Sequence, residues 1–343
     1  MPLDHLMYVD AVIRELDLRK PGFDYPLSWR TVYVGGGTPS LLKREALSKL
    51  MKNIGDYSHA IEVTIEANPE DVNHEWLSMV KDLGFTRVSM GVQSFFDDEL
   101  RLLGRRHDAS MAMNAIEALE NSGLDFSIDL IYGLPGQTVA RWNENLNRLI
   151  DYSPSHFSAY LLSIEPGTPF YREQVEEAPE EIACSMYELL CNEAAKCGYN
   201  HYEISNFATI GKEAKHNSAY WEDIPYIGLG PGAHSYNGEE RCANYRDIKL
   251  YMESIKKSLL PGDTEILTAT DKINDKIITA LRTAKGLDIK KLRFETESNR
   301  REFIKNIGKQ IESGNILTGA DGRVHIAEGR WLVSDSIIAY LMI

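Results

Sequence analysis

The stretch TVYVGGGTPS, residues 31–40, decides the fold of this chain. Residues 31–34 predict a short buried strand, and residues 41–54 predict a helix with one apolar side. Three glycines between a strand and a helix allow a tight turn whose bare N–H groups can approach a ligand. Alone, the pattern fits a purely structural turn equally well, because glycine turns close many strand–helix units.

Strand–helix pairs recur along residues 31–205, and each predicted strand is followed by a predicted helix. This alternation predicts parallel strands joined by right-handed crossovers, arranged as an open or partial barrel. A doubly wound sheet is the alternative. A helix over residues 3–19 precedes the series without a strand of its own. The six predicted strands, none of which reverses direction, are 31–34, 61–67, 87–92, 126–131, 156–162 and 199–204.

Three units are predicted along the chain: the barrel over residues 1–205, an extension over 206–262, and a helical unit over 263–343. The extension is rich in glycine, histidine and aromatic residues and shows little periodicity. The last unit reads as helices followed by a small hairpin and a final helix, which is a winged-helix-like order. That unit is not strongly basic, so we interpret it as a packing or lid domain rather than a DNA-binding one.

The composition indicates a globular protein of the cytoplasm. The chain has 343 residues, of which 43% are hydrophobic, and its formal net charge is −14. This acidity argues against non-specific binding of nucleic acid. No apolar run reaches the roughly 20 residues that a membrane helix needs, and the N-terminus lacks the pattern of a secretory signal.

Polar residues stand where the predicted strands end, which is the edge that carries the active site in barrels of this kind. Glu66 and Asp129 are embedded in apolar strands, where a carboxylate is costly unless it is paired or bound to a ligand. A salt bridge to Arg87 or Arg105 is the structural alternative for each carboxylate. Because both are expected on the same rim, ligand contact is favoured. The other residues expected on this rim are Gly36, Gly37, Thr38, Asn68, Gln93, Ser94, Tyr132 and Tyr160.

In the extension, His216 is accompanied by aromatic residues. The aromatic side chains suit a planar ligand, and the imidazole of His216 suits the role of an axial ligand to a metal ion. A buried aromatic cluster with hydrogen-bonded histidines is the alternative, and it is the commoner case in an arbitrary protein.

Taken together, these motifs resemble the radical SAM haem chaperones, which are related to the oxygen-independent coproporphyrinogen III oxidase. The resemblance covers nearly the whole chain. It rests on residues 35–40 (GGGTPS), 65–71 (IEANPED), 87–95 (RVSMGVQSF), 103–107 (LGRRH), 128–138 (IDLIYGLPGQT), 158–169 (SAYLLSIEPGTP), 202–208 (YEISNFA), 215–221 (KHNSAYW) and 226–236 (YIGLGPGAHSY).

The resemblance implies an α/β fold, a partial (β/α)6 radical SAM barrel lacking its first strand, with a C-terminal helical domain. It also implies binding of haem, of S-adenosylmethionine and, in the full-length family, of a [4Fe-4S] cluster. The residues implied to contact S-adenosylmethionine are Gly36, Gly37, Thr38, Glu66, Gln93, Arg105 and Asp129. The residues implied to contact haem are His216, as an iron ligand, and Asn217, Tyr220 and Trp221.

The chain departs from this family at the cluster. The family's CxxxCxxC triplet is absent, and the four cysteines are Cys184, Cys191, Cys197 and Cys242. Cys184 and Cys191 are seven residues apart on a predicted helix, or roughly 10 Å, which is too far for neighbouring irons of one cluster. We interpret all four as small buried apolar residues. Either the chain as given begins at a downstream methionine, or it is a genuine short variant. The first is favoured because the residues for S-adenosylmethionine remain.

Three functions stay open on the sequence alone. The first is a haem chaperone that passes haem to an acceptor protein. If that acceptor is a membrane protein, the chaperone would associate with the membrane surface through it. The second is a coproporphyrinogen III oxidase, and the third is a cluster-free haem-binding protein. The HNxxYW pattern of residues 216–221 favours the chaperone. The sequence does not decide whether radical chemistry, and hence enzyme activity, takes place.

Overall fold

A curved seven-stranded sheet organises the computed structural model, which describes residues 4–22 and 28–343. In this sheet the spatial order of the strands is β1-β2-β3-β4-β5-β7-β6, and β1 to β5 are parallel. Its strands are β1 (Thr31–Val34), β2 (Glu62–Ala67), β3 (Arg87–Gln93), β4 (Asp125–Tyr132), β5 (His156–Leu161), β6 (Asn200–Glu203) and β7 (Asn206–Ala208).

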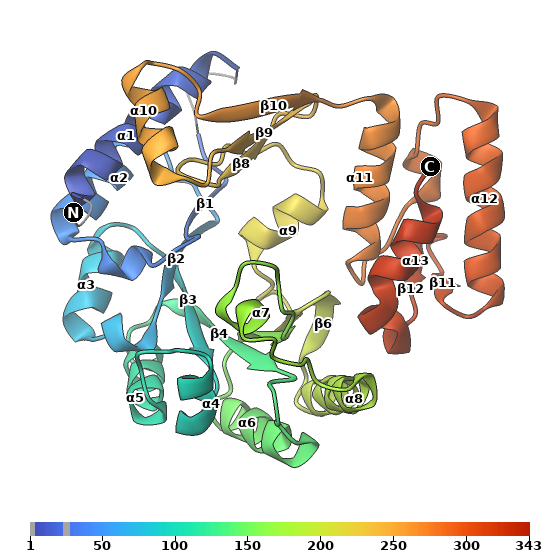
Figure 1. Ribbon diagram of the computed structural model, residues 1–343, viewed down its shortest axis with the longest axis horizontal. Coiled ribbons are helices and arrows are strands. Elements are labelled where there is room, and N and C mark those ends of the chain that lie inside the picture. The colour runs from blue at the N-terminus through green and yellow to red at the C-terminus, as the bar shows by residue number, and fades with distance from the viewer. Residues whose placement is uncertain (1–3, 23–27) are drawn as a thin grey trace.

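The helices of the barrel alternate with its parallel strands, as the sequence predicts (Figure 1). The α-helices of the described residues are α1 (His5–Arg19), α2 (Arg44–Asn53), α3 (His74–Asp82), α4 (Asp97–Leu102), α5 (Ala109–Glu120), α6 (Val139–Asp151), α7 (Pro169–Arg172), α8 (Glu180–Lys196), α9 (Lys215–Trp221), α10 (Ile248–Lys256), α11 (Ala269–Leu281), α12 (Glu297–Glu312) and α13 (Ser334–Leu341).

The end of the sheet corrects one prediction. The residues predicted as a single sixth parallel strand form β6, which reverses at Ile204 and Ser205 into β7. Strand β7 is antiparallel to both β5 and β6, so the last strands of the sheet form a hairpin. The open-barrel class holds, but its parallel part has five strands rather than six within the described residues.

Side chains alternate between the two faces of every strand, because successive Cβ atoms point to opposite sides. On β2, the apolar residues Val63 and Ile65 pack into the hydrophobic core beneath the outer helices. Glu62, Thr64 and Glu66 therefore lie on the concave face. The residues of neighbouring strands that share this polar face are Thr31 and Tyr33 on β1, Arg87, Ser89 and Gly91 on β3, Ser127 and Asp129 on β4, and His156, Ser158 and Tyr160 on β5.

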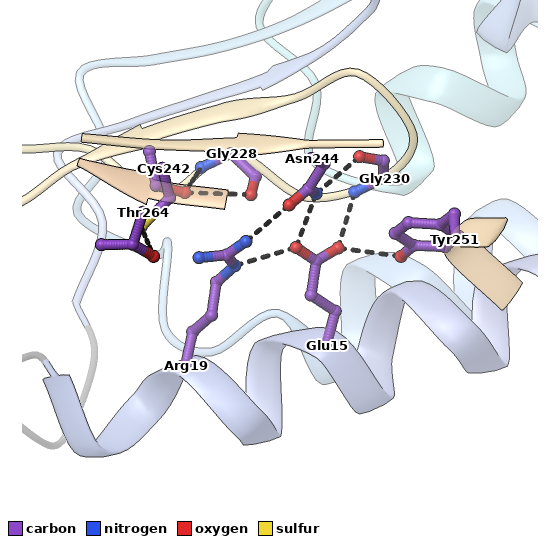
Figure 2. Close-up of polar contacts among 9 residues, drawn as sticks. Glu15, Arg19, Gly228, Gly230, Cys242, Asn244, Tyr251 and Thr264 are labelled. Atoms are coloured by element: carbon purple, nitrogen blue, oxygen red, sulfur yellow. Dashed lines mark hydrogen bonds and ion pairs between the residues drawn. The ribbon is translucent and has the colours of Figure 1, made fainter. Parts of the chain in front are cut away.

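Helix α1 is held by a buried ionic network. Arg19 Nε donates to Glu15 Oε1 at 2.8 Å, and Arg19 Nη2 donates to Asn244 Oδ1 at 2.7 Å. Glu15 Oε2 accepts from Tyr251 Oη and from the Gly230 N–H, each at 2.8 Å (Figure 2). Since a buried charge is costly without partners, this network fixes the first helix to the extension.

The extension contributes helix α9 and a three-stranded antiparallel sheet. That sheet has the order β10-β9-β8, with β8 (His234–Tyr236), β9 (Glu240–Asn244) and β10 (Gly262–Ile266). Helix α9, yellow in Figure 1, lies toward the concave side of the barrel.

The C-terminal unit consists of α11, α12 and α13 with the hairpin β11 (Ile316–Thr318) and β12 (Val324–Ile326). The division at residues 205 and 262 remains a prediction, and β10 runs across the second of these points. No helix of the described residues is long and apolar enough to span a bilayer.

Candidate functional site

The glycine turn after β1 holds a carboxylate against the end of the strand. Glu66 Oε2 accepts from the Gly36 N–H at 3.0 Å, and Glu66 Oε1 accepts from the Tyr33 hydroxyl at 2.8 Å. A Cβ atom at Gly35 would lie 2.4 Å from Tyr33 Cε1 and 2.6 Å from Glu66 Cδ. Only glycine fits there, whereas Gly36 and Gly37 face open space at their Cβ positions. The turn therefore leaves room for a ligand beside Glu66.

A second glycine with close neighbours is Gly91 on β3, which is two strands away from β1 in the sheet. A Cβ atom at Gly91 would lie 2.7 Å from Gln93 Nε2 and 3.3 Å from Arg105 Nη2. Arg105 Nη2 also donates to Asn68 Oδ1 at 2.7 Å. Gln93 has a φ of 67°, a left-handed conformation that is strained for glutamine, and it follows an irregularity in the β3–β4 register. Strain of this kind concentrates at functional sites.

Asp129 continues the polar face onto β4. Its carboxylate accepts from the Ser158 hydroxyl at 2.7 Å and from the Ser89 hydroxyl at 3.1 Å. The pKa of Asp129 is raised to about 6, mainly by burial and to a smaller extent by the negative charge of Glu66, against the lowering effect of the two serine hydroxyls and of Arg87. The group therefore changes charge just below neutral pH.

The salt bridges that were the structural alternative for Glu66 and Asp129 are not formed. Within the described residues, no ion pair joins Glu66 or Asp129 to Arg87 or Arg105. Both carboxylates are held by hydroxyl and backbone donors instead. Tyr132, which was predicted on the rim, points the other way: it is buried and stacks on Trp142 beneath the outer helices.

A buried network that the motifs did not reveal supports the loop after β3. Glu99 accepts from Ser94 Oγ, from Asn145 Nδ2 at 2.9 Å and from Gln137 Nε2 at 3.0 Å. Gln137 Oε1 in turn accepts from the Gly133 N–H at 2.9 Å. The network joins the loops that follow β3 and β4, so it positions Gln93 relative to Asp129.

His216 projects from α9 toward β1. The Thr31 hydroxyl lies 2.9 Å from His216 Nδ1, and the Tyr220 hydroxyl lies 2.9 Å from Nε2. The ring of Tyr33 stacks on the imidazole with a centroid distance of 5.0 Å and an interplanar angle of 22°. Burial lowers the pKa of His216, while the nearby Glu62 raises it by a smaller amount. The neutral imidazole is therefore favoured, in which one ring nitrogen donates its proton and the other accepts a hydrogen bond through its lone pair.

Glu62 fixes the start of α9 from inside the barrel. Its two carboxylate oxygens accept from the backbone N–H groups of Lys215 and His216, each at 2.9 Å. Glu62 is 6% exposed, so these donors hold a charge that burial would otherwise make costly. Sequence reasoning missed Glu62, Thr31 and Tyr33. The signal that identifies them is the polar residue at every second position of β1 and β2.

One cavity borders both predicted sites. It has a volume of about 440 Å³, and its lining includes the glycine turn, His216 and Tyr220. Its other walls are mostly apolar and come from α1, from α2 and the segment before it, and from the loop before β8; they include Val9, Val12, Leu42, Leu50 and Ile227. A partly apolar cavity lined by the neutral imidazole of His216, with His234 also on its wall, suits a flat, largely apolar ligand that carries a metal ion.

The predicted haem residues divide between two cavities. His216 and Tyr220 line the cavity beside β1, whereas Asn217 and Trp221 line a neighbouring one of about 600 Å³. Tyr220 also borders the second cavity. The four residues therefore do not converge on a single surface, and the pair nearest the glycine turn is His216 with Tyr220.

The cysteines do not form a metal site. Cys184 and Cys191 lie on α8 and Cys197 caps its end, while Cys242 lies on β9. The prediction that all four are buried is wrong for Cys197, which is exposed, and the other three are half-buried. Within residues 4–22 and 28–343, no group of three or more histidine, cysteine, aspartate or glutamate side chains is arranged to hold a metal ion. These residues do not fit an iron–sulfur cluster.

Comparisons with known proteins identify the family and the fold of the chain. The sequence profile of the radical SAM superfamily matches residues 5–149. The haem chaperone HemW of Bacillus subtilis (strain 168) is 32% identical over 323 residues, which cover 91% of this chain and 85% of the relative. The HemW of Synechocystis is 35% identical over 297 residues, covering 82% of this chain and 70% of the relative.

Among solved structures, the Escherichia coli coproporphyrinogen III oxidase HemN, described as a radical SAM enzyme, is similar to this chain with a TM-score of 0.84. The alignment covers 98% of this chain and 82% of that one at 22% identity. At this identity the similarity concerns the fold, and it agrees with the predicted radical SAM barrel.

Proposed function

The chain belongs to the haem chaperone family of the radical SAM superfamily, and on that premise we propose that it binds haem and passes it to an acceptor protein in the cytoplasm or at a membrane surface. The observation that carries this proposal is the environment of His216. Its imidazole is neutral, hydrogen-bonded at both nitrogens and directed into a largely apolar cavity.

The two hydrogen bonds of His216 give its nitrogens different roles. When Nδ1–H donates to Thr31, the lone pair of Nε2 faces the cavity and accepts from the Tyr220 hydroxyl. An orienting partner on the far nitrogen is the usual arrangement for a metal-ligating histidine. In this proposal Nε2 binds the haem iron once the Tyr220 hydroxyl turns away, and Asn217 and Trp221 contact the edge of the haem from the neighbouring cavity.

S-adenosylmethionine is the cofactor that membership of the radical SAM superfamily implies, and the polar face of the barrel fits it. Carboxylates suit its ammonium group and ribose hydroxyls, and open glycine backbone suits close approach of its methionine end. When bound, it would supply an adenosyl group on a sulfonium centre. We assign it to Gly36, Gly37, Thr38, Glu66, Gln93, Arg105 and Asp129. No step is assigned to a cluster, because the described residues offer no ligands for one.

The raised pKa of Asp129 indicates how the binding of S-adenosylmethionine should depend on pH. Because its pKa in the folded protein is about 6, the carboxylate is charged at pH 7.5 and loses its charge as the pH falls through about 6. We expect the affinity for S-adenosylmethionine to fall over this range. Calorimetric titrations of the wild type and of Asp129→Asn between about pH 5 and 8 measure this, and the variant should bind weakly at every pH. An equally steep loss near pH 6 in the variant would contradict the assignment.

The raised pKa of Asp129 also makes the stability of the fold depend on pH, but in the opposite direction to ligand binding. The folded pKa of Asp129 lies above the value of 3.8 for an exposed group, so the folded state binds the proton more tightly than the unfolded state. The contribution of Asp129 to the free energy of unfolding is therefore greatest below pH 3.8 and decreases as the pH rises to about 6, by roughly 2–3 kcal/mol. Asp129→Asn is expected to remove this decrease.

Transfer kinetics test the proposed function. The chain is loaded with haem and mixed either with apomyoglobin, which takes up only released haem, or with haem-depleted membranes from the cell that makes the protein. A chaperone predicts faster loss of haem to the membranes, with a rate that rises with their concentration, because transfer occurs in a complex. If haem leaves the chain at the same rate with both acceptors, and this rate does not depend on acceptor concentration, direct transfer in a complex is contradicted. Conversion of coproporphyrinogen III to protoporphyrinogen IX by the same preparation would favour the oxidase instead.

A further inference from the structure

Tyr33 touches both proposed sites. Its aromatic ring stacks on His216, and its hydroxyl donates to Glu66, which also accepts from the Gly36 N–H. We propose that Tyr33 couples the two sites, so that S-adenosylmethionine and haem each bind more tightly when the other is present. This inference rests on the proposed function and adds a positioning role for a residue that is not itself a ligand to either molecule.

The local packing leaves Tyr33 little freedom to move independently of its partners. Gly35 permits the side chains of Tyr33 and Glu66 to meet, since a Cβ atom there would overlap both. Burial raises the pKa of the Tyr33 phenol well above its usual value, and the charge of Glu66 raises it further. The hydroxyl therefore remains a donor at physiological pH, and the hydrogen bond to Glu66 persists.

The backbone of His216 is fixed by a different residue. Glu62 accepts from the N–H groups of Lys215 and His216, so the start of α9 is anchored to β2 by contacts within the chain itself. Thr31 holds Nδ1 of the imidazole. What remains adjustable is the tilt of the ring, and the surface against which it tilts is the ring of Tyr33.

These contacts give the coupling its sign. An ammonium or hydroxyl group that binds Glu66 holds the carboxylate in one orientation, and with it the Tyr33 hydroxyl. The stacked ring of Tyr33 then holds the imidazole in the orientation that faces the cavity. A ligand shifts an equilibrium only through contacts that differ between two states, and here both ligands favour the same ordered Tyr33. The effect must therefore be positive and reciprocal.

Tyr33→Phe separates the coupling from the binding itself, because phenylalanine keeps the ring against His216 and removes only the hydroxyl. Haem is titrated into the full chain, without and with saturating S-adenosylmethionine, and the reverse titration is performed by calorimetry. In the wild type we expect each ligand to lower the Kd of the other by about fivefold or more. In Tyr33→Phe we expect this factor to fall below about twofold, with haem binding alone nearly unchanged.

Tyr57→Phe is the matched control. Tyr57 is a partly buried tyrosine outside both sites, and its hydroxyl donates to the Leu83 carbonyl at 3.2 Å. This variant should keep the wild-type coupling factor. If the wild type binds both ligands without coupling, or if Tyr33→Phe retains the coupling, the inference is wrong while the proposed function stands. If the wild type fails to bind haem at all, the proposed function is wrong and this inference falls with it.

Discussion

Replacing His216 by alanine is expected to weaken haem binding by more than about tenfold and to abolish the spectral signature of histidine-ligated iron. The loss follows from removal of the imidazole that lines the cavity and is held in place by hydrogen bonds to Thr31 and Tyr220. Each tenfold loss corresponds to about 1.4 kcal/mol, which is modest for a lost metal–ligand bond. The measurement is a haem titration followed by absorption and electron paramagnetic resonance spectra.

Two further histidines make this test specific. His59 is exposed and does not line the cavity, so His59→Ala should bind haem as the wild type does. His234 lines the same cavity without the contacts to Thr31 and Tyr33. If His234→Ala loses the histidine signature and His216→Ala keeps it, the iron ligand has been assigned to the wrong residue. Because burial lowers the pKa of His216 below its ordinary 6.5, protonation should compete with iron only below that pH.

Gly35→Ala is expected to have the second large effect. The new methyl group would lie 2.4 Å from Tyr33 and 2.6 Å from Glu66, closer than carbon atoms approach in folded proteins. The pair must separate, and the hydrogen bonds that orient Glu66 are then lost. We expect the affinity for S-adenosylmethionine to fall by at least about tenfold, and the free energy of unfolding to fall by about 1–3 kcal/mol.

Gly308→Ala is the control for that substitution. Gly308 lies within α12, where a Cβ atom meets nothing within 4 Å, so alanine should leave binding unchanged and stabilise the helix slightly. Calorimetric binding and chemical unfolding are measured on both variants. Wild-type affinity in Gly35→Ala would show that the Tyr33–Glu66 pair does not shape the ligand site.

The parallel part of the barrel could be predicted from the sequence because its signals are local. Short apolar strands alternate with amphipathic helices, and β1 has the predicted bounds. The reversal between β6 and β7 could not be predicted, because only Ile204 and Ser205 separate the two strands and neither glycine nor proline marks the turn. Strand direction there is set by pairing with β5, which is a tertiary effect.

The candidate site was predictable in part for the same reason. Glu66, Gln93 and Asp129 belong to recognisable motifs, whereas Tyr33 and Glu62 belong to no motif beyond ordinary strand residues. Their roles depend on which face of the sheet receives α9, and that is set some 150 residues later in the chain by the contacts of Lys215 and His216. The buried pair Glu15 and Arg19 was missed because its partners are still more distant in sequence: Asn244 is 225 residues from Arg19, and Tyr251 is 236 residues from Glu15.

The measurement that tests the central claim most directly is an equilibrium titration of the whole chain with haem, followed in the visible spectrum for the wild type and for His216→Ala. The account predicts saturation at one haem per chain, with a histidine-ligated spectrum in the wild type that is absent in the variant. Non-saturating uptake, or identical spectra and affinities for the two proteins, would contradict it.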